Sequence, residues 1–153
     1  MHSLKSTFAK WVHGMANVIF EDNTIKLQEA MSERIEAALE EAAGELESQV
    51  KRNTRVDTGQ TKNSWQHNVT GSMMAGQHIA TVGSPLENAI WEEFGTGEYA
   101  LAGDGRKDGW SYRDEEGVWH HTMGKKPSRA LHNAVTSKKA KLVQMIADKL
   151  QGL

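Results

Sequence analysis

The chain has 153 residues, of which 38% are hydrophobic and 25% charged, and its formal net charge is −2. These values are typical of a folded globular domain and exclude the disordered, collagen-like and membrane-embedded classes. The absence of cysteine excludes a disulfide scaffold, a thiolate zinc site and a cysteine nucleophile. We expect one domain over residues 15–153, made in the cytoplasm. Residues 1–14 are expected to be either a leader before an alternative start at Met15 or a short amphipathic helix.

A long helix is predicted over residues 24–53. Its apolar residues recur at spacings of three and four and form one stripe, which comprises Leu27, Met31, Ile35, Ala38, Leu39, Ala42, Leu46 and Val50. The outer face is rich in glutamate, which is typical of a solvated helix surface.

Two β-hairpins are predicted after this helix. Residues 64–84 alternate in polarity on both sides of a glycine-rich turn, with His67 and Val69 on one face. A shorter pair of strands is expected at residues 110–113 and 118–121, joined by an acidic turn that ends in glycine.

A second helix is predicted at the C-terminal end. Pro127 and Ser128, a good N-cap residue, mark its start, and Gly152 marks its end. Its polar face is basic. The order of elements therefore predicts an α+β fold, in which a long N-terminal helix and a C-terminal helix pack on a mainly antiparallel sheet, with an exposed Gly-rich loop and hairpin.

Matches to metal and nucleotide motifs are weak. Residues 104–115 imitate a calcium loop, but Arg106 stands at a ligand position and no helix is expected on either side. Residues 95–100 fit the letters of a dinucleotide fingerprint without the strand and helix that it requires. The histidines at 120–121 are expected to point to opposite faces of a strand, and no spacing marks a nucleophile beside its base. We expect no enzyme and no cofactor; the alternative is a small metal-dependent hydrolase that uses the His, Asp and Glu residues of segment 104–121.

The stretch directly after the long helix, from Val56 to Ser64, is interpreted as a corner. Asp57 and Thr58 are expected to bond backbone groups of a turn while Gly59 takes a positive φ angle. Together they would redirect the chain from the helix to the first strand.

A second stretch, at residues 88–97, is expected to be a short helix or strand that Gly95 ends. Trp91 and Phe94 are expected to close the core from it, leaving Glu92 and Glu93 partly outside. A third stretch, Gly124 to Pro127, leads into the C-terminal helix.

In this order and at this spacing, the three stretches and the second hairpin resemble the tail-completion, or head–tail joining, proteins of siphophages and related prophages. The resemblance runs from about Ile25 to Leu150. Its motif residues are Val56, Asp57, Thr58, Gly59, Ser64, Trp91, Glu93, Phe94, Gly95, Thr96, Gly97 and Pro127, with the hairpin from Trp110 to Trp119. The chain departs from the pattern at Thr61, where leucine is usual, at Asn88, where tyrosine is usual, and at Ser128-Arg129, where an aromatic residue often follows the proline.

The resemblance implies a structural virion protein that completes the tail end or joins tail to head as a subunit of a homo-oligomeric ring. Its partners would be other tail or connector proteins, with no membrane, cofactor or specific nucleic acid, after synthesis in the host bacterial cytoplasm. Assembly candidates are basic: Arg106 and Lys107 in the Gly-rich loop, and Lys138, Lys139 and Lys141 on the last helix. These helix charges could pair with the acidic first helix of the same chain or face neighbouring subunits. A DNA contact through the basic helix is a weaker alternative, because no aromatic residue lies among the lysines.

Overall fold

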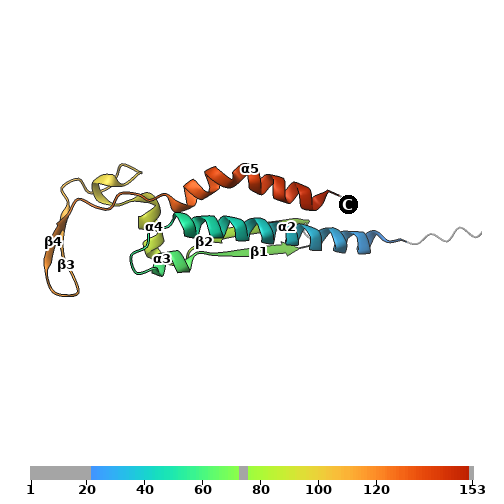
Figure 1. The fold of residues 1–153 in the computed structure, drawn as a ribbon, viewed down its shortest axis with the longest axis horizontal. Helices are drawn as coiled ribbons and strands as arrows, with labels where there is room; N and C mark the ends of the chain where they lie inside the picture. Colours follow the sequence, from blue (N-terminus) through green and yellow to red (C-terminus); the bar gives the residue numbers. More distant parts are fainter. Residues whose placement is uncertain (1–21, 73–75, 152–153) are drawn as a thin grey trace, which may run out of the picture.

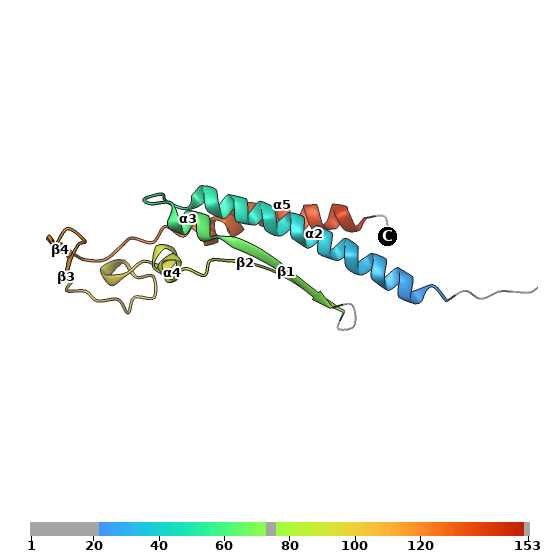
Figure 2. The same cartoon turned by 90° about the horizontal axis from the view of Figure 1, so that it is seen from below.

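The computed structural model describes residues 22–72 and 76–151, so the possible leader at residues 1–14 lies outside the described part. Helix α2 (Thr24–Asn53) has the predicted bounds and forms the centre of the body. Helix α5 (Ala130–Leu150) lies along one side of α2, and the hairpin of β1 (Gln66–Ser72) and β2 (Gln77–Gly83) lies along a second side (Figures 1 and 2). The α+β class is therefore confirmed. None of the described helices combines the length and apolar composition that a membrane crossing requires.

The face of the first hairpin that carries His67 and Val69 lies toward α2. In its antiparallel register His67 pairs with Val82, Val69 with Ala80, and Gly71 with His78. Because side chains alternate between the two faces of a strand, these residues share the inner face. The outer face is polar apart from Ile79, which is 48% exposed.

The strands do not form one sheet. The second hairpin, β3 (Trp110–Arg113) and β4 (Trp119–Thr122), is a separate two-stranded sheet. It lies on an arm that projects beyond the end of α2, away from both long helices (Figure 1). The helices therefore pack on the antiparallel first hairpin alone.

Three short helical segments connect these parts. Helix α3 (Gln60–Ser64), which the sequence patterns did not indicate, joins α2 to β1. Helix α4 (Glu87–Phe94) follows β2, and the 3₁₀ turn η1 (Gly97–Tyr99) begins the arm. Helix α4 lies at the end of the body, beside the start of α5 and at the base of the arm (Figure 2).

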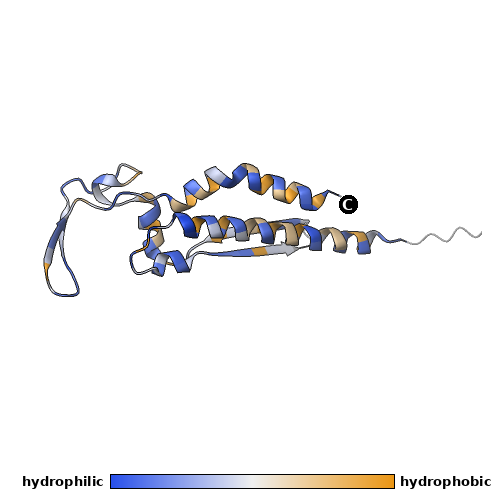
Figure 3. Ribbon diagram, in the orientation of Figure 1, coloured by the Kyte–Doolittle hydropathy of each residue, from blue (hydrophilic) through white to orange (hydrophobic). Residues whose placement is uncertain are grey.

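The core consists mostly of small side chains. Its buried apolar residues in the described part are Ala38, Ala42, Ala43, Val50, Trp65, Ala89, Ala130 and Ala134, and the largest side chain buried completely is that of Val50. Alanines on α2 and α5 let the two helices approach closely, and the apolar side of α5 faces α2 (Figure 3). Many larger apolar side chains lie partly or largely in solvent.

Candidate functional site: the α4 face and the neck of the arm

The arm leaves and rejoins the body through a neck formed by residues 95–98 and 123–127. The backbone N–H of Thr96 donates to the carbonyl of Lys125 at 2.9 Å, and that of Glu98 donates to Met123 at 2.8 Å. The N–H of Lys125 donates back to Oγ1 of Thr96 at 2.9 Å. The second and third sequence motifs, which are 27 residues apart from Gly97 to Gly124, thus form one structural unit.

Glycine is required in the neck because its two chain segments touch there. A Cβ on Gly97 would collide with the carbonyl oxygen of Met123, and one on Gly124 would collide with that of Thr96. A Cβ on Gly95 would lie 2.9 Å from Cδ of Pro127. The motif glycines and the proline therefore act together as a packed junction, with nothing in it that resembles a nucleotide-binding helix start.

Glu93, which was expected to lie partly outside the core, is buried, with 8% of its surface exposed. Its two carboxylate oxygens accept the backbone N–H groups of Leu131 and His132, each at 2.9 Å. These are among the first N–H groups of α5, which have no partner within their own helix. The carboxylate therefore caps α5 from a neighbouring element, where a negative charge is also favoured by the helix dipole.

The expectation that Trp91 and Phe94 close the core is wrong. Trp91 is 47% exposed and Phe94 is 56% exposed. The physical reason is the orientation of α4, which turns Ala89 and Glu93, one turn apart, toward the body because α5 needs the cap. The aromatic residues are thereby left on the opposite side of the helix.

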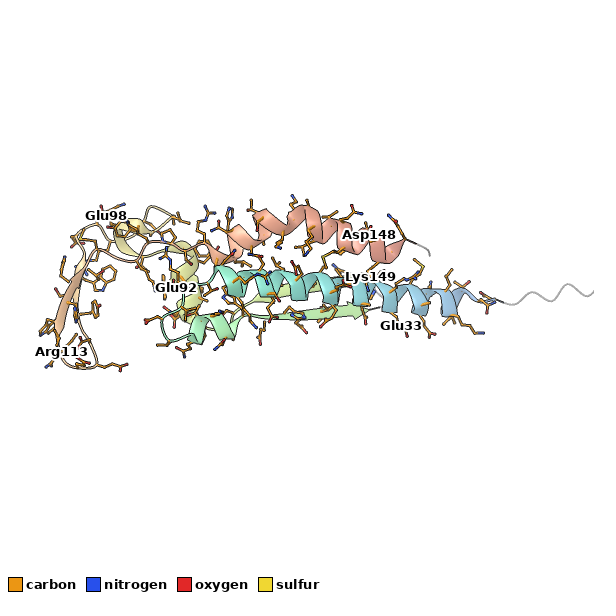
Figure 4. The ribbon with its side chains drawn as sticks, in the orientation of Figure 1. Glu33, Glu92, Glu98, Arg113, Asp148 and Lys149 are labelled. Carbon is orange, nitrogen blue, oxygen red and sulfur yellow. The ribbon has the colours of Figure 1, made fainter. Side chains whose placement is uncertain are left out.

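Ser128 is not the N-cap of α5. The helix begins at Ala130, and Arg129 precedes it in the left-handed region with φ 54°. Ser128 instead donates from both its N–H (2.7 Å) and its Oγ (3.0 Å) to the carbonyl of Glu92. Glu92, labelled in Figure 4, also pairs through its side chain with Lys125. The carboxylate of Glu93 therefore caps α5 in place of Ser128, the N-cap that the sequence suggested.

The corner after α2 is formed mainly by Gly59, which takes the expected positive φ of 82° as the N-cap of α3. Thr58 Oγ1 accepts the N–H of Gln60 at 3.4 Å. Asp57 is exposed and makes no side-chain hydrogen bond within the described residues, and Val56 is 61% exposed. Ser64 links the end of α3 to the segment before α4 through a 2.6 Å hydrogen bond to Ser84.

The basic residues of α5 are divided between the fold and the solvent. Lys138 and Lys141 bind Glu45 of α2 at 3.0 and 2.8 Å, and Lys149 pairs with Glu41 at 2.9 Å, between the two helices (Figure 4). Lys141, and next Lys138, lower the pKa of Glu45 to about 2. Of the two alternatives that the sequence left open, pairing within the chain is the one found for Lys138 and Lys141. Lys139 is exposed and has no partner among the described residues.

Two histidines, His67 and His78, link the first hairpin to α2. These links were not predicted from the sequence. His67 lies between Glu47 and Glu40, with Nε2 3.0 Å from Glu40, and the hydrogen bond to Glu47 is the main cause that raises the pKa of His67. His78 lies within 3.2 Å of Ser32 and 3.4 Å of Glu36. The signal available in the sequence was the glutamate-rich face of α2 opposite a histidine on each strand.

The arm does not assemble the metal site of the hydrolase alternative. Asp114 pairs with His120 at 2.7 Å, and that hydrogen bond is the main cause that lowers the pKa of Asp114. Arg106 pairs with Asp108 at 2.9 Å, and Lys107 is exposed nearby. Over residues 22–72 and 76–151, no three His, Asp or Glu side chains come together in a way that could hold a metal ion.

The fold and the site define a class of protein: a small α+β protein that exposes large apolar side chains and holds a projecting arm. Residues 20–95, about half of the chain, match the family described as "Bacteriophage HK97-gp10, putative tail-component". Through these residues the chain belongs to the HK97-gp10-like family of phage tail components, and the resemblance noted from the sequence is confirmed. The match includes α2, the first hairpin and α4, and it ends before the arm. No curated protein and no solved structure matches the chain.

Proposed function

We propose that this chain is a non-catalytic virion protein that completes the upper end of a phage or prophage tail, or joins tail to head, as one subunit of a ring. Membership of a family of tail components supports a structural role among other phage proteins. In this proposal the partners are further tail or head–tail connector proteins, and the single domain spans residues 15–153.

The observation that supports this role most is the distribution of apolar side chains. The core is made largely of alanine, while Ile90, Trp91, Phe94, Leu101 and Trp119 are each between 47% and 68% exposed. Large exposed apolar patches on a folded subunit mark contacts with other proteins. A subunit of this kind is suited to a place between neighbours rather than to existence as a free monomer.

The proposal is tested in a phage that encodes this chain. Antibody labelling of purified virions should place the protein at the head-proximal end of the tail. A mutant that does not make the protein should accumulate unjoined heads and tails in electron micrographs of the lysate. Label at the distal tip, or normal joined virions without the protein, would refute the proposed role.

A further inference from the structure

An apolar groove lies where α2, α5 and β2 meet. Its volume is about 330 Å³, and all ten residues that line it are apolar. Helix α2 contributes Leu39 and Leu46, β2 contributes Ala80 and Val82, and α5 contributes residues such as Val135. A groove of this size is in the range of pockets that bind small molecules or side chains.

Helix α4 exposes a face of the kind that such a groove can bind. Glu87, Ile90, Trp91 and Phe94 stand at positions i, i+3, i+4 and i+7, so their side chains share one side of the helix. Ile90 is 53% exposed, and Trp91 and Phe94 are about half exposed. Helices that dock into apolar grooves use this spacing for their anchor residues.

The charges beside the two surfaces are complementary. Glu87 is exposed on the apolar face of α4 and forms no ion pair within the described residues. On α5, Lys139 follows Val135 by four residues and therefore lies on the groove side of the helix. It is exposed and also lacks a partner in the part of the chain that the structure describes.

The helix face cannot fill the groove of its own chain. Glu93 fixes the opposite face of α4 to the start of α5, so the exposed face is directed away from the body. We propose that the α4 face of one copy, formed by Glu87, Ile90, Trp91 and Phe94, docks into the groove between α2, α5 and β2 of a second copy, with Glu87 near Lys139 of that copy.

The apolar area that α4 exposes is too small for a stable interface by itself, so the contact has to include more than α4. Trp91 and Phe94 together still expose on the order of 200 Å², given the size of aromatic side chains. A stable interface buries about 800 Å² on each partner. The remainder has to come from Ile90, from Leu101, whose N–H is bonded to the carbonyl of Phe94, and from the apolar residues of the arm.

Because the two surfaces are different, each copy offers one helix face and one groove. Such a head-to-tail contact closes into a ring when the rotation between copies allows it. The inference thus rests on the proposed ring and names the surfaces that build it.

The test uses the full chain and two single variants, Trp91→Ser on α4 and Ala80→Trp in the groove. Ala80 is exposed, so tryptophan there fills the groove without changing the core. We expect the wild type to self-associate in sedimentation velocity and each variant to weaken association at least about tenfold, as loss of an interface anchor does. Ile79→Ser is the matched control, since Ile79 is 48% exposed on the outer face of the same strand and should leave association unchanged.

Mixing the two variants gives the sharpest outcome. Trp91→Ser keeps an intact groove and Ala80→Trp keeps an intact helix face, so an equimolar mixture should form heterodimers and stop there. A wild type that stays monomeric up to about 1 mM, the limit of a weak complex, would overturn the inference, as would rings that form equally well with either variant. The second result would leave the proposed place in the tail untouched, because virion labelling tests that separately.

Cysteine crosslinking shows whether α4 of a second copy or the N-terminal segment occupies the groove. The chain has no cysteine, so single replacements are specific. Val135→Cys protein mixed with Ile90→Cys protein should yield a disulfide-linked heterodimer under mild oxidation. A preferential link from Val135→Cys to Trp11→Cys would assign the groove to the N-terminal segment and overturn the inference.

Discussion

Removing the carboxylate of Glu93 should destabilise the chain more than removing any exposed acid. Glu93 is buried and accepts two N–H groups at 2.9 Å from the first turn of α5. A hydrogen bond to a charged group contributes about 1.5–3 kcal/mol, and a lost N-cap costs about 0.5–2 kcal/mol. Because both donors would be left without a partner, we expect Glu93→Ala to cost about 2–4 kcal/mol in the free energy of unfolding. Glu93→Gln keeps an acceptor oxygen and should cost about 1–2 kcal/mol.

The assay is chemical denaturation, followed by amide hydrogen exchange. A loss of 3 kcal/mol in a chain of this length should lower Tm by roughly 6–12 °C. The N–H groups of Leu131 and His132 should exchange faster in Glu93→Ala before other amides of α5 do. Glu98→Gln is the control, because Glu98 is exposed and its side chain forms no hydrogen bond within the described residues. If Glu93→Ala unfolds within about 0.5 kcal/mol of the wild type, an effect as small as that of a surface substitution, the carboxylate does not cap α5.

Three further predictions concern the corner and the two sides of α2. Gly59→Val should cost about 1–3 kcal/mol, because valine would be forced to a φ near 82°, whereas Gly83→Ala, with open space and no positive φ, should be nearly neutral in thermal melting. Glu45 has a lowered pKa of about 2, so the stability that its ion pairs contribute is present above its usual pKa of 4.5 and is lost as the pH falls toward 2. After allowance for solvent screening, the free energies of unfolding of wild type and Glu45→Gln should differ by about 1–2 kcal/mol at pH 7 and converge in acid. His67 has a raised pKa, so the stability that its ion pairs contribute is complete below its usual pKa of 6.5 and is lost as the pH rises through its pKa in the folded state. Urea titrations should show the free energies of unfolding of wild type and His67→Gln converging in alkali. A difference that widens in alkali would contradict the pairing of His67 with the two glutamates.

Local patterns predicted the elements well. The bounds of α2 follow from the apolar stripe and were confirmed at Thr24 and Asn53. The two hairpins follow from period-two alternation, and the positive φ of Gly59 follows from the lack of a Cβ. These features depend on interactions between residues that are close in sequence, which is why sequence patterns alone were enough.

The site depended on contacts between distant residues. The orientation of α4 is set by the demand of α5 for an acceptor, 38 residues further along the chain. Without knowledge of that contact, the usual rule that aromatic residues are buried and glutamates exposed assigned Trp91 and Glu93 to the wrong sides. The same holds for Ser128, which is a good cap by type but was replaced by Glu93 in the folded chain.

The two faces of α4 connect the stability of a subunit with its assembly. One face holds the first turn of α5 through Glu93, and α5 in turn supplies one wall of the groove, including Val135. If the other face docks into a neighbour, as proposed, then fixing α4 in one copy also fixes the wall of the groove that receives the next copy. This coupling gives Glu93 a physical reason to stand beside Trp91 and Phe94 in one short motif: the same helix has to be held on one side and offered on the other.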